Sequence, residues 1–165
     1  MTLAVGENHH DGNFSDDDFS SGIWRPTGAG SSFFEYADTG PLYIGPGLQH
    51  SNWRGVCQYG FESAGDYSVA VLSMIDAGDI TSGLYTSTIA VPQSAVNADP
   101  DDPEGRFQVA LGFIDEVNMV RETDERVKWS TYTQVATYWE AQKNGTPLRL
   151  DFSQIPSDLY TCSPR

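Results

Sequence analysis

The sequence predicts an α/β protein: an incomplete, barrel-like arrangement of parallel strands and helices, preceded by a loop-rich N-terminal part. From residue 66 onward, helix and strand patterns alternate in the order α–β–α–β–α. About 35 residues separate the two predicted strands, which is enough chain for a parallel crossover that contains a helix. The first 65 residues are rich in Gly, Pro and Ser, and the strands predicted there are short.

Caps and apolar spacing predict the first two helices. Asp66 is a suitable N-cap for a helix over 67–75, and Gly78 is a natural stop for it. Asp102 and Pro103 supply an N-cap and a favoured first residue for the second helix. The apolar face of that second helix has i, i+3, i+4, i+7 spacing and is expected to be buried through Phe107, Ala110, Leu111, Ile114 and Val117.

The third helix has the clearest start signal. Thr131 and Gln134 have the spacing of a capping box, in which the two residues satisfy each other's backbone N–H groups. Gly145 and Pro147 mark its end, because proline cannot continue a helix. Its apolar stripe is expected to consist of Val135, Ala136, Tyr138 and Trp139.

Strands are predicted where β-branched and aromatic residues are dense. Residues 84–91 form such a segment before Pro92, and residues 127–130 form a shorter one. In the N-terminal part, residues 2–5 and 41–44 have the same character. Because a helix lies between the two late strands, we expect those strands to be parallel neighbours in one sheet.

Composition limits the class of protein and its partners. The 165 residues include 9 Lys and Arg against 23 Asp and Glu, for a formal net charge of −14. This length predicts a single domain over 1–165. Nucleic acid is not an expected partner, because the acidic surface repels phosphate. No apolar run approaches the roughly 20 residues of a membrane span.

The two cysteines and two glycosylation sequons favour a secreted protein, although residues 1–6 lack the features of a signal peptide. Cys57 and Cys162 allow one disulfide, and a disulfide typically contributes roughly 2–4 kcal/mol by restricting the unfolded chain. Two unrelated buried thiols are the alternative, and the sequence leaves both interpretations open.

The densest polar cluster follows the first predicted strand. It contains His9, His10 and Asp11, and imidazole and carboxylate groups are the usual ligands of zinc. Since active sites of α/β proteins lie at strand ends, we expect a divalent metal here, zinc first. The alternative is a solvated loop with one hydrogen-bonded histidine.

Aromatic residues and one arginine suggest a ligand site in the N-terminal part. Arg25 stands beside Pro26 and could present its guanidinium to a carboxylate in an active site. Trp24 and Trp53 belong to a series of nine aromatic residues that could stack on sugar rings. The alternatives are an arginine on a surface turn and aromatic side chains that form ordinary core.

Several segments resemble polysaccharide deacetylases of the NodB-homology family. Residues 127–139 are similar to the family's terminal strand and helix, and residues 84–91 with the helix after them resemble the unit before. Residues 22–26 are similar to the arginine–proline motif, and residues 7–11 to the histidine-bearing metal motif. The resemblance implies an incomplete β/α barrel and a hydrolase that removes acetyl groups from a polysaccharide.

The resemblance also implies site roles. His9 or His10 would bind the metal, Asp11 would be catalytic, and Arg25 would orient the base, while metal-bound water attacks the acetyl group. The chain departs from the family because Asp16–Asp18 is followed by Phe19 rather than glycine, and it is short for the whole barrel. We therefore expect a partial or diverged member that lacks full activity alone. The alternative function is a non-catalytic secreted module that binds glycan or protein through its N-terminal aromatic residues.

Overall fold

The structure is a computed structural model that divides into two compact units. The chain crosses between the two units several times, so each unit consists of three separate segments. Unit 1 comprises residues 1–47, 82–87 and 129–154, and unit 2 comprises residues 48–81, 88–128 and 155–165. The prediction of a single domain over 1–165 stays a prediction. The residues that the structure describes are 3–5, 21–28, 35–45, 47, 49–50, 57, 60–89, 93–102, 105–142, 148–150 and 152–163.

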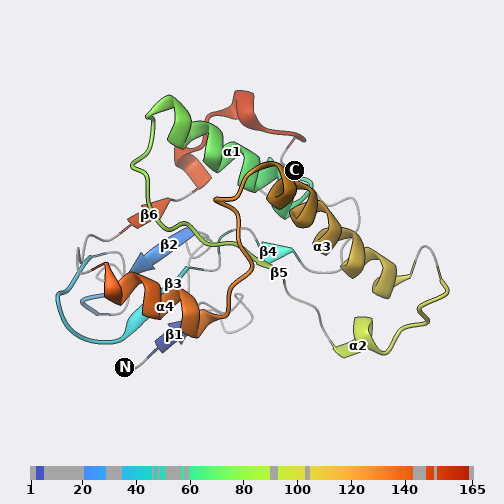
Figure 1. Cartoon of the computed structure of the whole chain (residues 1–165), viewed down its shortest axis with the longest axis horizontal. Helices are drawn as coiled ribbons and strands as arrows, with labels where there is room; N and C mark the ends of the chain where they lie inside the picture. The colour runs from blue at the N-terminus through green and yellow to red at the C-terminus, as the bar shows by residue number, and fades with distance from the viewer. Residues whose placement is uncertain are drawn as a thin grey trace. The chain divides into compact units, whose positions relative to one another are not determined.

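Unit 1 contains a four-stranded sheet in the order β1-β3-β2-β6 (Figure 1). Its strands are β1 (Leu3–Val5), β2 (Ser21–Trp24), β3 (Leu42–Ile44) and β6 (Leu148–Leu150). β1 pairs in parallel with β3, whereas β2 runs antiparallel to both β3 and β6. A short 3₁₀ helix, η3 (Phe152–Gln154), follows β6.

This topology shows that the predicted parallel α/β barrel is wrong. The fold is α+β, and three of the four strands, β3, β2 and β6, form an antiparallel arrangement. Residues 127–130 form no strand. The described part of segment 84–91 contributes β5 (Thr88–Ile89), which pairs in parallel with β4 (Gln49–His50) in unit 2. β-Branched residues favour an extended backbone, but they do not select a partner strand, so the prediction failed at the pairing.

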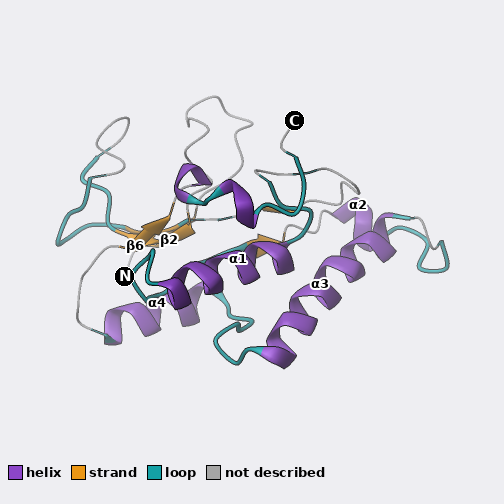
Figure 2. Ribbon diagram, turned by 90° about the horizontal axis from the view of Figure 1, so that it is seen from above, coloured by secondary structure: helices purple, strands orange, loops and turns teal. Residues whose placement is uncertain are grey.

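The core of unit 1 lies between the sheet and α4 (Tyr132–Ala141). The predicted capping box of Thr131 and Gln134 is confirmed. Figure 2 shows α4 along one side of the strands, and α4 contacts β3. Apolar side chains fill this layer: Ile23, Leu42, Ile44 and Ala136 are buried, with Leu84, Val135 and Trp139 packed against them.

Thr86, which lies in an irregular segment, forms hydrogen bonds with the sheet. Its carbonyl oxygen accepts a hydrogen bond from Ser21 Oγ at 2.6 Å, and its hydroxyl donates to the Gly45 carbonyl at 2.6 Å. The Gly22 backbone N–H donates to the same hydroxyl at 3.0 Å. Gly22 has φ +119°, and a Cβ built there would lie 1.9 Å from the carbonyl oxygen of Leu148. Only glycine allows this close approach of β2 and β6.

Unit 2 is built on two helices, α1 (Ala64–Ala77) and α3 (Arg106–Thr123), which pack against each other. α2 (Gln93–Val96) and the 3₁₀ helix η4 (Ser157–Leu159) complete its described elements. Its buried apolar residues are Phe61, Ala64, Tyr67, Ala70, Val71, Met74, Ala110, Phe113, Val117 and Ile155. Among the described residues, no helix has both the length and the apolar character needed to cross a bilayer.

The helices of unit 2 were predicted, and Gly78 ends α1 as predicted, but the starts of both long helices were not. Ser63, not Asp66, is the N-cap of α1, and its side chain accepts a hydrogen bond from the Asp66 backbone N–H. Gly105, not Asp102, precedes α3. Leu111 was predicted to be buried and is exposed, because it lies about 100° or more around α3 from the buried Ala110, Phe113 and Val117.

Cys57 and Cys162 form a disulfide with a Cα–Cα distance of 5.8 Å, so the bridged interpretation is the one that the structure supports. The C-terminal segment also has contacts of its own with the body of unit 2. The Thr161 backbone N–H donates to the Gly60 carbonyl oxygen at 2.8 Å. The Tyr160 ring meets Phe61 edge-on, with centroids 5.7 Å apart.

Candidate functional site

Two of the six predicted site residues can be located in the structure. Trp24 and Arg25 are neighbours at the end of β2. Successive side chains of an extended chain point to opposite sides, so these two residues have different surroundings. The other four lie outside the described residues: His9, His10, Asp11 and Trp53.

The predicted zinc site stays a prediction, because its ligands are among the residues that are not described. Within the described part of the chain, no three His, Cys, Asp or Glu side chains are grouped so that they could hold a metal ion.

Trp24 lies in the core of unit 1. It is the cross-strand partner of Tyr43, their ring centroids are 4.7 Å apart, and the planes are tilted by 52°. The Trp24 side chain is only 1% exposed, so its ring faces are covered by protein. Cross-strand aromatic pairs stabilise a sheet, and this pair joins β2 to β3.

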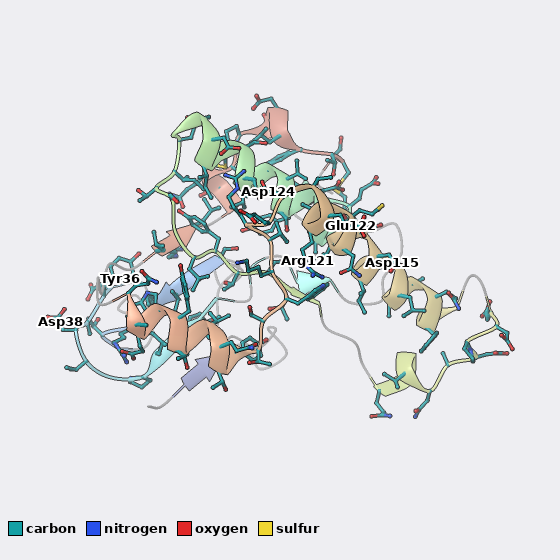
Figure 3. The ribbon with its side chains drawn as sticks, in the orientation of Figure 1. Tyr36, Asp38, Asp115, Arg121, Glu122 and Asp124 are labelled. Atoms are coloured by element: carbon teal, nitrogen blue, oxygen red, sulfur yellow. A yellow bond between two sulfur atoms is a disulfide. The ribbon has the colours of Figure 1, made fainter. Side chains whose placement is uncertain are left out.

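Arg25 begins a short antiparallel extension of β2. The Ala37 backbone N–H donates to the Arg25 carbonyl oxygen at 2.8 Å, and the Thr27 N–H donates to the Glu35 carbonyl oxygen at 3.2 Å. Pro26 bridges Tyr36 between these two bonds. This pairing fixes the backbone on which Tyr36 and Asp38 project from the edge of unit 1 (Figure 3).

The Arg25 side chain joins three segments of unit 1. Its guanidinium donates hydrogen bonds to the Gly40 carbonyl oxygen and to the Glu140 carboxylate of α4. It also lies over the Trp139 ring, 5.4 Å from the centroid. The Arg25 side chain is 14% exposed, and cation–π and charge-assisted contacts both hold it in place. This geometry makes Arg25 a positioning residue that holds the 25–40 segment against α4.

Unit 1 carries a set of exposed aromatic side chains, which we call the aromatic set: Tyr36, Trp129, Tyr132 and Tyr138. Tyr36 lies on the extension of β2, and the other three lie on α4 or just before it. All the exposed large aromatic side chains of the described residues belong to this unit. In unit 2, the exposed large apolar side chains are aliphatic: Val69, Val96, Leu111 and Met119.

One member of this set was assigned to the core from the sequence. Tyr138 was assigned to the buried stripe of α4, but it is 56% exposed. Two residues of α-helix rotate by about 200°, so Tyr138 points away from the buried Ala136. No local pattern could have paired Arg25 with Glu140, because 115 residues separate them.

Unit 2 contains two polar clusters with shifted acidities. Hydrogen bonds from Arg126 lower the pKa values of Asp76 and Asp124, and Arg126 Nη1 lies 2.7 Å from Asp76 Oδ1. Burial raises the pKa of Glu116, and a hydrogen bond with Ser63 opposes that shift. The Arg126 cluster joins the end of α1 to the segment after α3, so its role is structural.

No family model, curated protein or solved structure that was compared matches this chain. Function must therefore be argued from the side chains themselves.

Proposed function

We propose that the protein is a non-catalytic module that binds a neutral glycan through the aromatic set of unit 1. The observation that carries the proposal is the segregation of exposed aromatic side chains. Tyr36, Trp129, Tyr132 and Tyr138 are exposed in unit 1, whereas unit 2 exposes only aliphatic side chains of comparable size among the described residues. Flat rings with a polar edge suit a ligand that presents both C–H faces and hydroxyl groups.

α4 and the segment that carries Tyr36 are held in place by several contacts, which favours binding. α4 has a complete capping box and packs its inner side on Ile23, Leu42 and Ile44. Arg25 and Glu140 connect α4 to the segment that carries Tyr36. A preorganised surface loses little conformational entropy when a ligand binds, so modest contacts can give measurable affinity.

Charge and polar side chains indicate the class of glycan. The net charge of −14 disfavours sulfated or uronic acid polymers by like-charge repulsion. Thr133, Thr137 and Glu140 lie exposed on α4 and offer hydroxyl and carboxylate groups. These groups can exchange hydrogen bonds with sugar hydroxyls. A neutral polysaccharide is therefore the proposed ligand.

The proposal can be tested by affinity electrophoresis in native gels that contain a neutral or an anionic polysaccharide. We expect retardation of the wild-type protein by at least one neutral polymer, and no retardation by sulfated or uronic acid polymers. A Tyr36→Ala/Tyr138→Ala variant should bind about tenfold more weakly, which is typical when aromatic contact residues are truncated.

Val69→Ala provides the matched control, because Val69 is an exposed apolar residue of unit 2. This variant should be retarded like the wild type. Equal retardation of all three proteins would contradict the role of the aromatic set, as would the absence of retardation by every neutral polymer.

The deacetylase hypothesis predicts a different result. A metal-dependent enzyme would release acetate from an acetylated chito-oligosaccharide in the presence of zinc, and a His10→Ala variant would lose both the metal and the activity. The binding proposal predicts no acetate release under those conditions. Acetate release that depends on His10 would overturn the non-catalytic assignment.

A further inference from the structure

Helix α3 has two different faces. Its inner face packs on α1 through Ala110, Phe113 and Val117, which are buried. Its outer face carries a stripe of exposed residues at i, i+4, i+8 and i+11, which we call the α3 stripe: Leu111, Asp115, Met119 and Glu122. At 100° per residue these four side chains lie within about 80° of one another around the helix.

The two apolar residues of the α3 stripe, Leu111 and Met119, are exposed to solvent. Met119 is 60% exposed, the largest value among the large apolar side chains of the described residues. Leu111 lies two turns earlier on the same side and is also exposed. Exposed methionine is typical of surfaces that adapt to apolar partners, and a shallow hollow lined by Asn118, Arg121 and Glu122 adjoins the stripe.

The charge of this surface determines what can cover it. Asp115 and Glu122 are acidic and lie on α3 together with Arg121 (Figure 3). Arg121 lies beside the stripe and donates a hydrogen bond to Asn118 on the same flank. Unit 2 as a whole carries 14 Asp and Glu against 6 Lys and Arg. A second copy of this chain would bring two acidic stripes together, so like-charge repulsion disfavours that occupant.

We propose that the α3 stripe binds an amphipathic helix of a partner protein, one with a basic edge along its apolar face. Apolar side chains of the partner would cover Leu111 and Met119, and its Lys or Arg side chains would meet Asp115 and Glu122. This is a helix-on-helix mode of recognition, with apolar anchors about two turns apart on α3. It involves unit 2 alone, so it does not depend on the glycan proposal for unit 1.

The test uses two synthetic helical peptides of equal length, one with leucine and lysine and the other with leucine and glutamate. Fluorescence anisotropy of labelled peptides reports their binding to the intact protein. We expect the lysine peptide to bind and the glutamate peptide not to bind. Binding should weaken as salt rises from 50 to 500 mM, because the Debye length at 0.1 M salt is only about 10 Å.

Two variants assign the binding to the α3 stripe. The double variants Leu111→Ser/Met119→Ser and Asp115→Asn/Glu122→Gln should each bind the lysine peptide with an affinity lower by about tenfold or more. Val69→Ser, which changes an exposed apolar residue on α1, should bind like the wild type, and circular dichroism should show that every variant is folded.

Three outcomes would overturn the proposal. They are absence of lysine-peptide binding by the wild type, equal binding of both peptides, and full binding by the stripe variants. A concentration-dependent dimer that the Leu111→Ser/Met119→Ser variant abolishes would assign the stripe to a second copy instead, and would also overturn it.

Discussion

Replacing Cys57 and Cys162 with serine should lower the free energy of unfolding by about 4.7 kcal/mol. The bridge joins residues 105 positions apart, so it restricts the unfolded chain over nearly two thirds of its length. The loop-entropy relation gives about 16 cal/mol/K for a loop of this size, which is the 4.7 kcal/mol at 25 °C. Unfolding entropy is about 2.1 cal/mol/K per residue, so the melting temperature should fall by roughly 13 °C.

The folded state should survive this change, because the C-terminal segment has other contacts. The Thr161 and Cys162 backbone N–H groups donate to Gly60, and Tyr160 packs on Phe61. Far-ultraviolet circular dichroism of the variant should therefore match that of the wild type. The loss of stability then arises mainly from the unfolded chain, and not from a damaged core.

Guanidinium denaturation of the oxidised wild type, the reduced wild type and the double serine variant measures this effect. The reduced wild type and the variant should agree with each other, and both should unfold at lower denaturant than the oxidised protein. A difference below about 1 kcal/mol between oxidised wild type and variant would refute the reasoning, since the long loop would then not be the source of stability.

Three further perturbations test single contacts. Replacing Arg25 with methionine should destabilise the protein by about 1–2 kcal/mol in thermal melts. A double-mutant cycle with Glu140→Gln should give a coupling energy below about 1 kcal/mol, because the ion pair is partly exposed. Gly22→Ala should cost about 3 kcal/mol or more, as a β6 carbonyl oxygen occupies the Cβ position. Gly40→Ala, which has a similar φ but open space, should cost only about 1–2 kcal/mol, and equal losses would contradict the steric argument. Glu116→Gln should stabilise the protein at pH 7, because burial raises the pKa of this carboxyl and the folded state therefore prefers its protonated form. That gain should shrink as the pH falls towards about 4, and denaturation curves in which it grows instead would reverse the assigned cause.

Features that depend only on residues within one helical turn were predicted well from the sequence. The capping box of Thr131 and Gln134 and the stop at Gly78 needed only neighbouring residues, and both are present. The existence of all three long helices followed from apolar spacing. The exact starts of α1 and α3 did not, because Ser63 and Gly105 compete with nearby Asp residues for the capping position.

The sheet could not be predicted because its pairing is not local. β2 and β6 have only four and three residues, and each is defined by a partner far away in the chain. The antiparallel contact between them depends on Gly22, whose meaning becomes visible only when the carbonyl of Leu148 is beside it. The same limit applies to the site, because the contact of Arg25 with Glu140 has no sequence pattern.

The kind of side chain alone did not predict which aromatic residues are exposed. Trp24 and Tyr43 were grouped with possible sugar-binding residues, and both are buried. Tyr138 was grouped with the core, and it is exposed. Hydrophobic type alone cannot separate these cases, since burial depends on which side of a strand or helix meets the sheet.

Calorimetric titration of a soluble neutral oligosaccharide into the wild-type protein and into the Tyr36→Ala/Tyr138→Ala variant tests the glycan proposal most directly. The proposal predicts saturable binding at one site per chain for the wild type and affinity about tenfold lower for the folded variant. Identical isotherms for the two proteins, or no heat of binding with any neutral oligosaccharide, would contradict it.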